Sequence, residues 1–464
     1  MADKINRVIV LMLENRSFDH VLGSLAPEIA ELKGINLASP GINTYDGKPY
    51  SQKPGAARFL NFDPRHELEH VAVQLKGGNA GFVQDFAQSY PSADPATDLP
   101  EVMKYHASGV LPAIHELAKN FTVCDQWYAS VPGPTWCNRL FALSGTSLGR
   151  VAMPDGIMSL NLHWYSQPTL FDRLNEKKIP WKVYFGDAPL SFLFVNQWEK
   201  DNVARHRTMT EFYRDVATAT TTDSDPKKGD PLGLPPFSFI EPAYFQPGAT
   251  DAHPPHDIFA ADALVGSVYN AIRANEKLWS ETLLVVAFDE HGGFYDHVTP
   301  PRAEAPDFHQ EEYSFDQLGI RVPVILVSPW VRARVFSDVM DHTSLLKYLT
   351  GKWSLGPLGY RTRDAATFNA AITDQFRDNV LPSVEHSRAP ASNLNPDARP
   401  PLFEKLTTNQ HALLALSHVL ESMAGEEASV IASRARSVLS HAQSQIDTAI
   451  DRFESFLTKR GRAS

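Results

Sequence analysis

The stretch Leu283-Leu284-Val285-Val286-Ala287-Phe288 runs directly into Asp289-Glu290-His291-Gly292-Gly293-Phe294-Tyr295-Asp296-His297. An unbroken apolar run of this length is typical of a strand that is buried on both faces of a mainly parallel sheet. Two adjacent carboxylates at the end of such a strand are costly unless a cation or several donors neutralise them. The two glycines allow the backbone to turn sharply beside them. The stretch therefore predicts a buried strand with a candidate metal site at its carboxyl end; a loop with exposed charges is the alternative.

Other apolar runs along the chain also end in polar or acidic residues. These runs are Val8–Leu13, Phe121–Val123, Trp181–Phe185, Phe237–Ile240 and Val322–Val327. Helical spacing lies between them, at Leu111–Asn120, Thr169–Lys178 and Asp257–Trp279. Alternating strands and helices predict an α/β fold, a three-layer α/β/α sandwich with a mainly parallel central sheet. Ligands of open α/β sheets bind beyond the carboxyl ends of the strands, which is where the acids are found here.

Composition changes towards the C-terminus. We predict one domain over residues 1–385, a linker rich in Pro, Ser and Asn over 386–402, and a helical segment over 403–464 broken near Gly425. The C-terminal helices could pack on the domain, bind a membrane surface or form an oligomer contact, and packing is favoured. Ala217–Pro236 has the composition of a long surface loop.

The 464 residues carry a formal net charge of −11 and no basic stripe, which argues against nucleic acid as a partner. Cys124 and Cys137 form neither a disulfide framework nor a zinc-ligand set. The apolar run at Val8–Leu13 is too short for a secretory signal or a membrane span. We expect a cytoplasmic protein, or one exported without a recognisable Sec signal.

Two further clusters carry chemistry-bearing side chains. Glu14-Asn15-Arg16-Ser17-Phe18-Asp19-His20 follows the first strand, and its oxygen ligands suit hard divalent cations. Its alternative is a turn in which Asn15 or Ser17 caps the next helix. Pro132-Gly133-Pro134 precedes a helical pattern that starts just after Thr135, where helical N–H groups favour an anion. The Thr135 hydroxyl is either a nucleophile beside a metal or a helix N-cap.

Histidines near the ends of predicted elements could supply cationic donors and a general acid to a phosphoryl site. They occur in Asp63-Pro64-Arg65-His66, in His253-Pro254-Pro255-His256-Asp257 and in Asp341-His342-Thr343-Ser344.

Taken together, these motifs resemble the bacterial and plant non-specific phospholipase C family, which includes the AcpA-type acid phosphatases. The resemblance rests on E-N-R-S-F-D-H from residue 14, G-P-T-x-x-N-R-x-x-A-L-S-G-T from residue 133 and D-E-H-G-G-F-Y-D-H-V from residue 289. H-P-P-x-D from residue 253 and D-H-T-S-L-L-K-Y-L from residue 341 support it. The motifs occur in family order over residues 5 to 350, and Cys137 departs from the proline that is common there.

The resemblance implies an alkaline-phosphatase-like fold with one divalent metal ion. Calcium, magnesium or manganese is favoured by the oxygen ligands, while nearby histidines would also permit iron or zinc. By motif, the metal ligands are Glu14, Asn15, Asp289, Glu290 and Thr135. The catalytic residues are Thr135, as nucleophile, with His253 and His66. The substrate-binding residues are Asn138, Arg139, His291 and His342.

The expected function is therefore a metal-dependent phosphoric ester hydrolase. The favoured form is a phospholipase C that cleaves phosphatidylcholine-type lipids to diacylglycerol and a phosphorylated headgroup through a phosphothreonine, with transient contact at the membrane surface. The alternatives are an acid phosphatase of the same family and a non-catalytic binding protein on the same fold. A sulfatase is disfavoured, because the residues around Cys137 do not form the Cys-x-Pro-x-Arg motif. The sequence leaves the oligomeric state open.

Overall fold

The fold is built around an eight-stranded sheet. The computed structural model describes residues 4–154, 166–220, 233–245, 248–388 and 407–423, together with residues 452 and 455. Within these ranges the strand order is β13-β6-β12-β11-β1-β10-β8-β9. The strands are β1 (Arg7–Leu13), β6 (Thr122–Cys124), β8 (Trp181–Phe185), β9 (His206–Thr208), β10 (Phe237–Glu241), β11 (Thr282–Phe288), β12 (Val324–Val327) and β13 (Arg334–Phe336).

All six strands predicted from apolar runs are present in this sheet. β1 and β11 lie side by side at its centre, and every residue of both is buried. β12 runs antiparallel to both of its neighbours, whereas the other pairings are parallel. The carboxyl ends of β1 and β11 therefore meet at one edge, and they bring the residue 14 and residue 289 clusters together.

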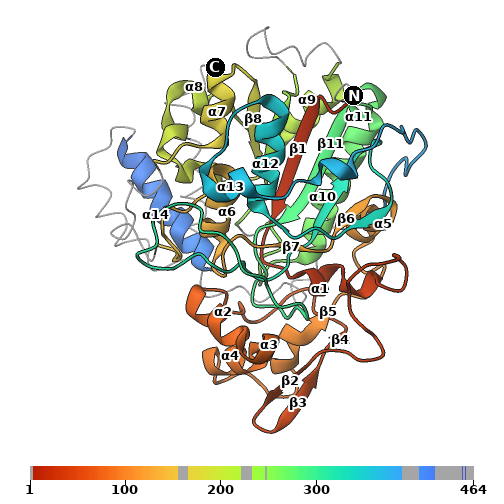
Figure 1. Ribbon diagram of the computed structural model, residues 1–464, viewed down its shortest axis with the longest axis vertical. Coiled ribbons are helices and arrows are strands. Elements are labelled where there is room, and N and C mark those ends of the chain that lie inside the picture. Colours follow the sequence, from red (N-terminus) through yellow and green to blue (C-terminus); the bar gives the residue numbers. More distant parts are fainter. Residues whose placement is uncertain are drawn as a thin grey trace.

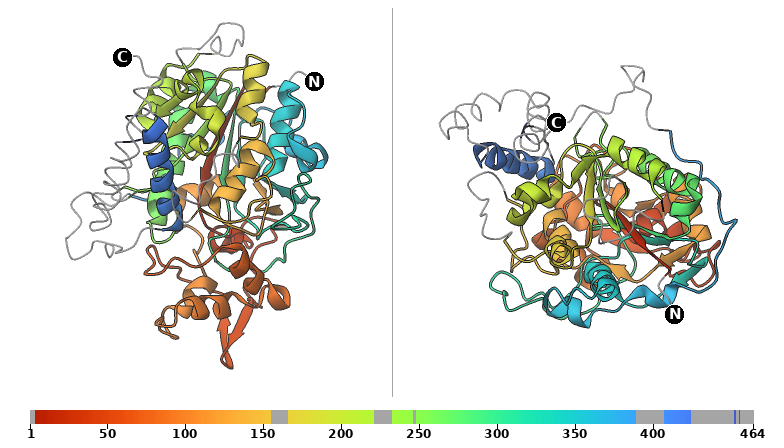
Figure 2. Two further views of the ribbon diagram at one scale, coloured as in Figure 1. Left: turned by 90° about the vertical axis from the view of Figure 1, so that its left-hand side faces the viewer. Right: turned by 90° about the horizontal axis from the view of Figure 1, so that it is seen from above.

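Helices cover both faces of the sheet and confirm the three-layer sandwich (Figures 1 and 2). One layer contains α5 (Pro112–Asn120), α9 (Met209–Thr218) and α10 (Ile258–Ala274). The other contains α6 (Thr135–Ser144), α7 (Leu170–Glu176) and α12 (His342–Trp353). The pattern predicted over Asp257–Trp279 is split, because Asn275 ends α10 and caps the short helix α11 (Glu276–Trp279).

A small cap lies beyond the carboxyl ends of the strands, at the lower end of Figure 1. Its elements are β2 (Ile42–Tyr45), β3 (Lys48–Ser51), α2 (Leu68–Gln74), α3 (Lys76–Asn79) and α4 (Phe82–Ser89). The cap has a hydrophobic cluster of its own, centred on Val71, Phe82 and Phe86. This separate cluster was not predicted from the sequence.

The C-terminal helix α14 (Thr408–Met423) packs against the flank of the sandwich (Figure 2). Its buried residues Ala412, Leu413 and Leu416 join the main hydrophobic core. Most of the predicted linker, 386–402, and the predicted break near Gly425 lie outside the described residues. Among the described helices, none is long and apolar enough to cross a membrane.

Candidate active site

The polar clusters of β1, α6 and β11 converge at the carboxyl edge of the sheet. Glu14, Asn15, Thr135, Asp289 and Glu290 are all buried. The Asn15 backbone N–H donates to Asp289 Oδ1 at 3.2 Å, which joins the first and third motifs. The structure therefore brings together all five residues that were predicted as metal ligands.

The backbone is tightly constrained where these motifs meet. Asn15 has a φ of 57°, in the left-handed region that non-glycine residues rarely adopt. Gly292 has a φ of 63°, and a Cβ atom there would lie 2.2 Å from the Asn15 carbonyl oxygen. Gly292, the first glycine of the Gly-Gly pair, is thus required because the Asn15 backbone lies too close to leave room for a side chain.

Thr135 is the first residue of α6, and Pro134 occupies the N-cap position. The Thr135 hydroxyl does not cap the helix; it donates to Asn15 Oδ1 at 3.2 Å. The N-cap alternative is therefore wrong, and the hydroxyl faces the candidate metal ligands. Next to it, Cys137 is buried with a free thiol, and burial raises the pKa of that thiol to about 12.

Two of the buried carboxylates share one arginine. Arg139 bridges Glu14 and Asp289, with both nitrogen–oxygen distances at 3.2 Å. Burial raises the pKa of Asp289 to about 7 and that of Glu14 well above its ordinary value, although Arg139 opposes both shifts. Glu290 Oε1 is buried without a hydrogen-bond partner among the described residues. Two buried carboxylates that share one guanidinium, with a third carboxylate beside them, are oxygen groups of the kind that a divalent cation binds.

A second acidic group has a different charge balance. Asp19, Asp296 and His297 place ligand-type atoms within 4.8 Å of one another. Here Arg321 already bridges Asp19 and Asp296, at 3.1 and 2.9 Å. Asp19 Oδ2 also accepts a hydrogen bond from Gln52. These two carboxylates are therefore already paired within the protein.

The two predicted catalytic histidines, His66 and His253, are in edge-to-face contact, with ring centroids 5.5 Å apart and an angle of 80° between the ring planes. His66 Nε2 lies 3.3 Å from Asn15 Nδ2 and 4.0 Å from Glu290 Oε1. Burial opposes protonation of His66, but Glu290 and other nearby acids raise its pKa to about 9. His253 Nε2 is buried without a partner among the described residues. Burial, His66 and His256 lower the pKa of His253.

The predicted substrate-binding residues lie against the site rather than in an open cavity. His342 Nε2 lies 2.6 Å from the Asp289 carbonyl oxygen, and His291 Nδ1 lies 3.2 Å from Glu290 Oε2. The side-chain amide of Asn138 is hydrogen-bonded to the backbone of the turn before α6, at Val131, Gly133 and Pro134. These contacts hold the ligand-bearing backbone in place, and contact of these residues with substrate stays a prediction.

Several residues near the site were not singled out from the sequence. Asp63 lies 3.7 Å from His253 Nδ1, and burial raises the pKa of Asp63 to about 7. Asp63 was part of a quoted motif, so its acidic type could have marked it. Asn409, in α14, donates to Glu14. No sequence motif pointed to Asn409, because it lies in a helical stretch far from every motif.

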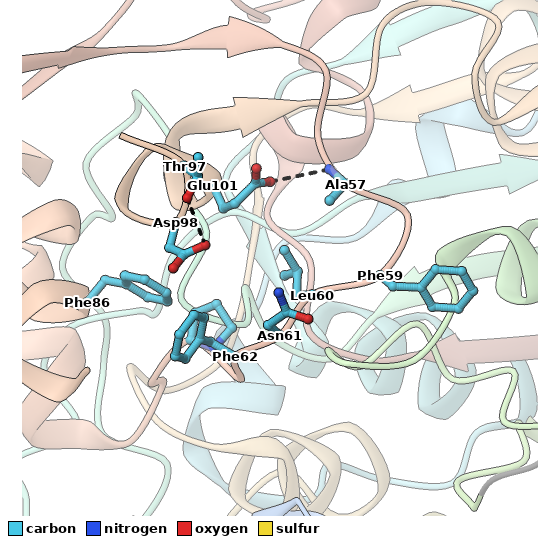
Figure 3. A pocket seen from close by; sticks show the side chains of 10 residues that line it. Ala57, Phe59, Leu60, Asn61, Phe62, Phe86, Thr97, Asp98 and Glu101 are labelled. Atoms are coloured by element: carbon cyan, nitrogen blue, oxygen red, sulfur yellow. Dashed lines mark hydrogen bonds between the residues drawn. The ribbon is translucent and has the colours of Figure 1, made fainter. Parts of the chain in front are cut away.

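A pocket of about 170 Å³ lies in the cap, next to the segment that carries His66 (Figure 3). Phe59, Leu60, Phe62 and Phe86 line it together with the carboxylates of Asp98 and Glu101. Pro64 also lines it, and the Pro64 carbonyl oxygen lies 2.9 Å from His66 Nδ1. One loop therefore both forms a pocket wall and orients a candidate catalytic histidine.

An acid-rich centre, a hydroxyl at a helix N-terminus and two histidines in contact define an enzyme site for an anionic ester. The chain belongs to the phosphoesterase family, whose model matches residues 5–356. It is thus a phosphoric ester hydrolase, as the sequence predicted.

Curated relatives agree with this assignment. The chain is 32% identical to non-specific phospholipase C6 of Arabidopsis thaliana, over 91% of this chain and 83% of that one. It is 34% identical to non-specific phospholipase C1 of the same plant, over 70% and 61%. It is 27% identical to phospholipase C A of Mycobacterium tuberculosis, over 76% and 73%.

Solved structures resemble the chain more distantly. An alkaline phosphatase superfamily protein from Vibrio parahaemolyticus aligns with a TM-score of 0.32 and 12% identity, over 52% of this chain and 60% of that one. The phosphonate monoester hydrolase of Agrobacterium radiobacter aligns with a TM-score of 0.36 and 10% identity, over 80% and 77%.

Proposed function

We propose that this hydrolase is a metal-dependent phospholipase C that cleaves phosphatidylcholine-type lipids to diacylglycerol and a phosphorylated headgroup. The observation that carries the metal dependence is the buried set of Glu14, Asp289 and Glu290, in which Glu290 Oε1 has no hydrogen-bond partner among the described residues. The lipid substrate is supported by the relatives, which are named phospholipases C from a plant and a mycobacterium.

The reaction would use Thr135 as the nucleophile. A divalent cation held by Glu14, Asn15, Asp289 and Glu290 would lower the pKa of the Thr135 hydroxyl and offset the charge of the phosphate. Thr135 Oγ1 already lies within hydrogen-bond distance of Asn15, so its oxygen faces this centre. Attack of that oxygen on phosphorus forms a phosphothreonine and breaks the bond to the leaving alcohol.

A histidine would then protonate the leaving oxygen. His253 is favoured over His66, because its Nε2 has no protein partner among the described residues, whereas His66 Nε2 faces Asn15 and Glu290. An anionic phosphoester bound beside His253 would raise its pKa and favour the protonated form. Water then hydrolyses the phosphothreonine and restores the threonine hydroxyl.

Product analysis tests the proposal directly. The purified protein is incubated with phosphatidylcholine and, separately, with p-nitrophenyl phosphate, in the presence of calcium, magnesium, manganese, iron or zinc. We expect diacylglycerol and phosphocholine from the lipid, and loss of both after chelation. Release of phosphate from the monoester alone would instead place the protein in the acid phosphatase branch. Undetectable hydrolysis of any phosphoester with metal bound would favour a binding protein.

A further inference from the structure

The first turn of α14 reaches the candidate active site from outside the family match. The family model ends at residue 356, whereas α14 starts at Thr408. Thr407 and Gln410 close this turn reciprocally: the Gln410 backbone N–H donates to Thr407 Oγ1, and the Thr407 N–H donates to Gln410 Oε1. Such a capping box fixes the start of a helix. The position of Asn409, inside this turn, is therefore well defined.

Asn409 connects two parts of the site through both ends of its amide. Its Nδ2 lies 3.1 Å from each carboxylate oxygen of Glu14. Its Oδ1 accepts a hydrogen bond from Trp136 Nε1 at 2.9 Å. Trp136 directly follows Thr135 on α6, and Asn409, Glu14 and Trp136 are all buried. The amide orientation is thus determined, because the carboxylate requires the donor and the indole requires the acceptor.

Other residues of α14 anchor the helix on the rest of the protein. Gln410 Nε2 donates to the Tyr244 carbonyl oxygen at 2.9 Å and lies 3.3 Å from His256 Nε2. Ala412, Leu413 and Leu416 are buried in the main core. A side chain that is fixed at both its backbone and its amide can hold a partner carboxylate in one orientation.

We propose that Asn409 is a positioning residue that orients Glu14 for metal binding, so that the C-terminal helix completes the catalytic unit. The inference rests on the proposed function, since it takes Glu14 as a metal ligand. Side chains that hydrogen-bond to ligating carboxylates fix ligand geometry, and their loss commonly costs about 10- to 100-fold in metal affinity. Arg139 contacts Glu14 at Oε1, whereas Asn409 contacts both Oε1 and Oε2.

The test measures binding of Mn²⁺ to the full-length chain, by electron paramagnetic resonance and by calorimetry. The variants are Asn409→Ala, Asn409→Asp and Glu14→Gln, with two controls on the same helix. His411→Ala changes an exposed residue, whereas Gln410→Ala breaks the capping box of the turn that carries Asn409 but keeps the Asn409 amide. We expect Asn409→Ala to weaken binding about 10- to 100-fold and Asn409→Asp to weaken it further through charge repulsion. His411→Ala should stay within about twofold of the wild type, and Gln410→Ala should weaken binding less than Asn409→Ala does.

A second readout separates positioning from folding. If Asn409 orients Glu14, saturating Mn²⁺ restores part of the turnover of Asn409→Ala, and thermal unfolding of the metal-free variant matches that of Gln410→Ala. Unchanged Mn²⁺ affinity in Asn409→Ala, with lost affinity in Glu14→Gln, would overturn this inference alone. Equal affinity in the wild type and Glu14→Gln would overturn the metal site, and the proposed function with it.

Discussion

At the residue scale, the assignment of Thr135 makes a sharp prediction. Thr135→Val preserves shape but removes the hydroxyl, so turnover should fall by at least about 10³-fold. Stability should change by only about 1 kcal/mol, because within the described part of the chain the hydroxyl donates one hydrogen bond, to Asn15. Thr135→Ser keeps a nucleophile and should retain measurable turnover. Mass spectrometry of acid-quenched reactions should find phosphate on residue 135 in the wild type; a fully active valine variant would sink the assignment.

The role of His253 can be tested by varying the leaving group. A general acid matters most when the leaving alcohol is a poor one, so His253→Asn should slow phosphatidylcholine cleavage by at least about 10²-fold. Cleavage of p-nitrophenylphosphorylcholine, whose leaving group needs no proton, should slow far less. His66→Asn serves as the comparison, and it should slow both substrates alike. If His66→Asn instead slowed phosphatidylcholine cleavage selectively and His253→Asn slowed both substrates alike, the general acid would be His66.

Site residues could be predicted from the sequence where they belong to a short motif that directly follows a strand. Asn15, Asp289 and Glu290 follow strands directly, so their motifs located them without a structure. Asn409 was not predictable in this way, because its contact with Glu14 joins residues 395 positions apart. Asn138 resembled a substrate ligand, but a short polar side chain beside a proline-rich turn is also well placed to bond that turn, and it does so.

At the scale of elements, Arg321 links the helix after β1 to the loop after β11. It donates to Asp19 in α1 (Phe18–Val21) and to Asp296, and its guanidinium lies 4.4 Å from the Phe18 ring centre. Arg321→Met would leave two buried carboxylates without their cation, which costs about 3–5 kcal/mol. Urea unfolding should show this loss.

A matched control is available on the surface. Arg302 pairs with Asp316, and both side chains are largely exposed. Arg302→Met should therefore change the free energy of unfolding by less than about 1 kcal/mol. Equal effects of the two substitutions would contradict a structural role for the Arg321 pairs and would reopen Asp19 and Asp296 as a cation site.

The elements also show which parts of the fold a pattern can predict. Unbroken apolar runs located β1, β8, β10 and β11 to within a residue or two. The reversed direction of β12 was not predictable, because a buried run has the same pattern in either direction. The cap was missed because its short helices and strands bury only a small cluster of their own.

At the scale of the whole molecule, the parts converge on one edge of the sheet. The sandwich supplies the proposed metal ligands at the ends of β1 and β11, the cap supplies His66, and α14 supplies Asn409. Each contributes a buried side chain to a site that no single segment completes. This arrangement explains why the five motifs are dispersed over more than 300 residues of the chain and yet act together.

If the proposed phospholipase C activity is correct, the net charge of −11 affects how the enzyme docks on a lipid surface. An acidic protein is repelled by an anionic membrane, and the repulsion is screened by salt. Adding phosphatidylglycerol to phosphatidylcholine vesicles should therefore reduce turnover several-fold at low ionic strength, and salt near 0.5 M, where the screening length is only about 4 Å, should largely restore it. Water-soluble p-nitrophenylphosphorylcholine needs no surface, so its turnover should not respond to the added vesicles. Faster lipid cleavage on anionic vesicles would instead show that a local basic surface, and not the net charge, governs docking.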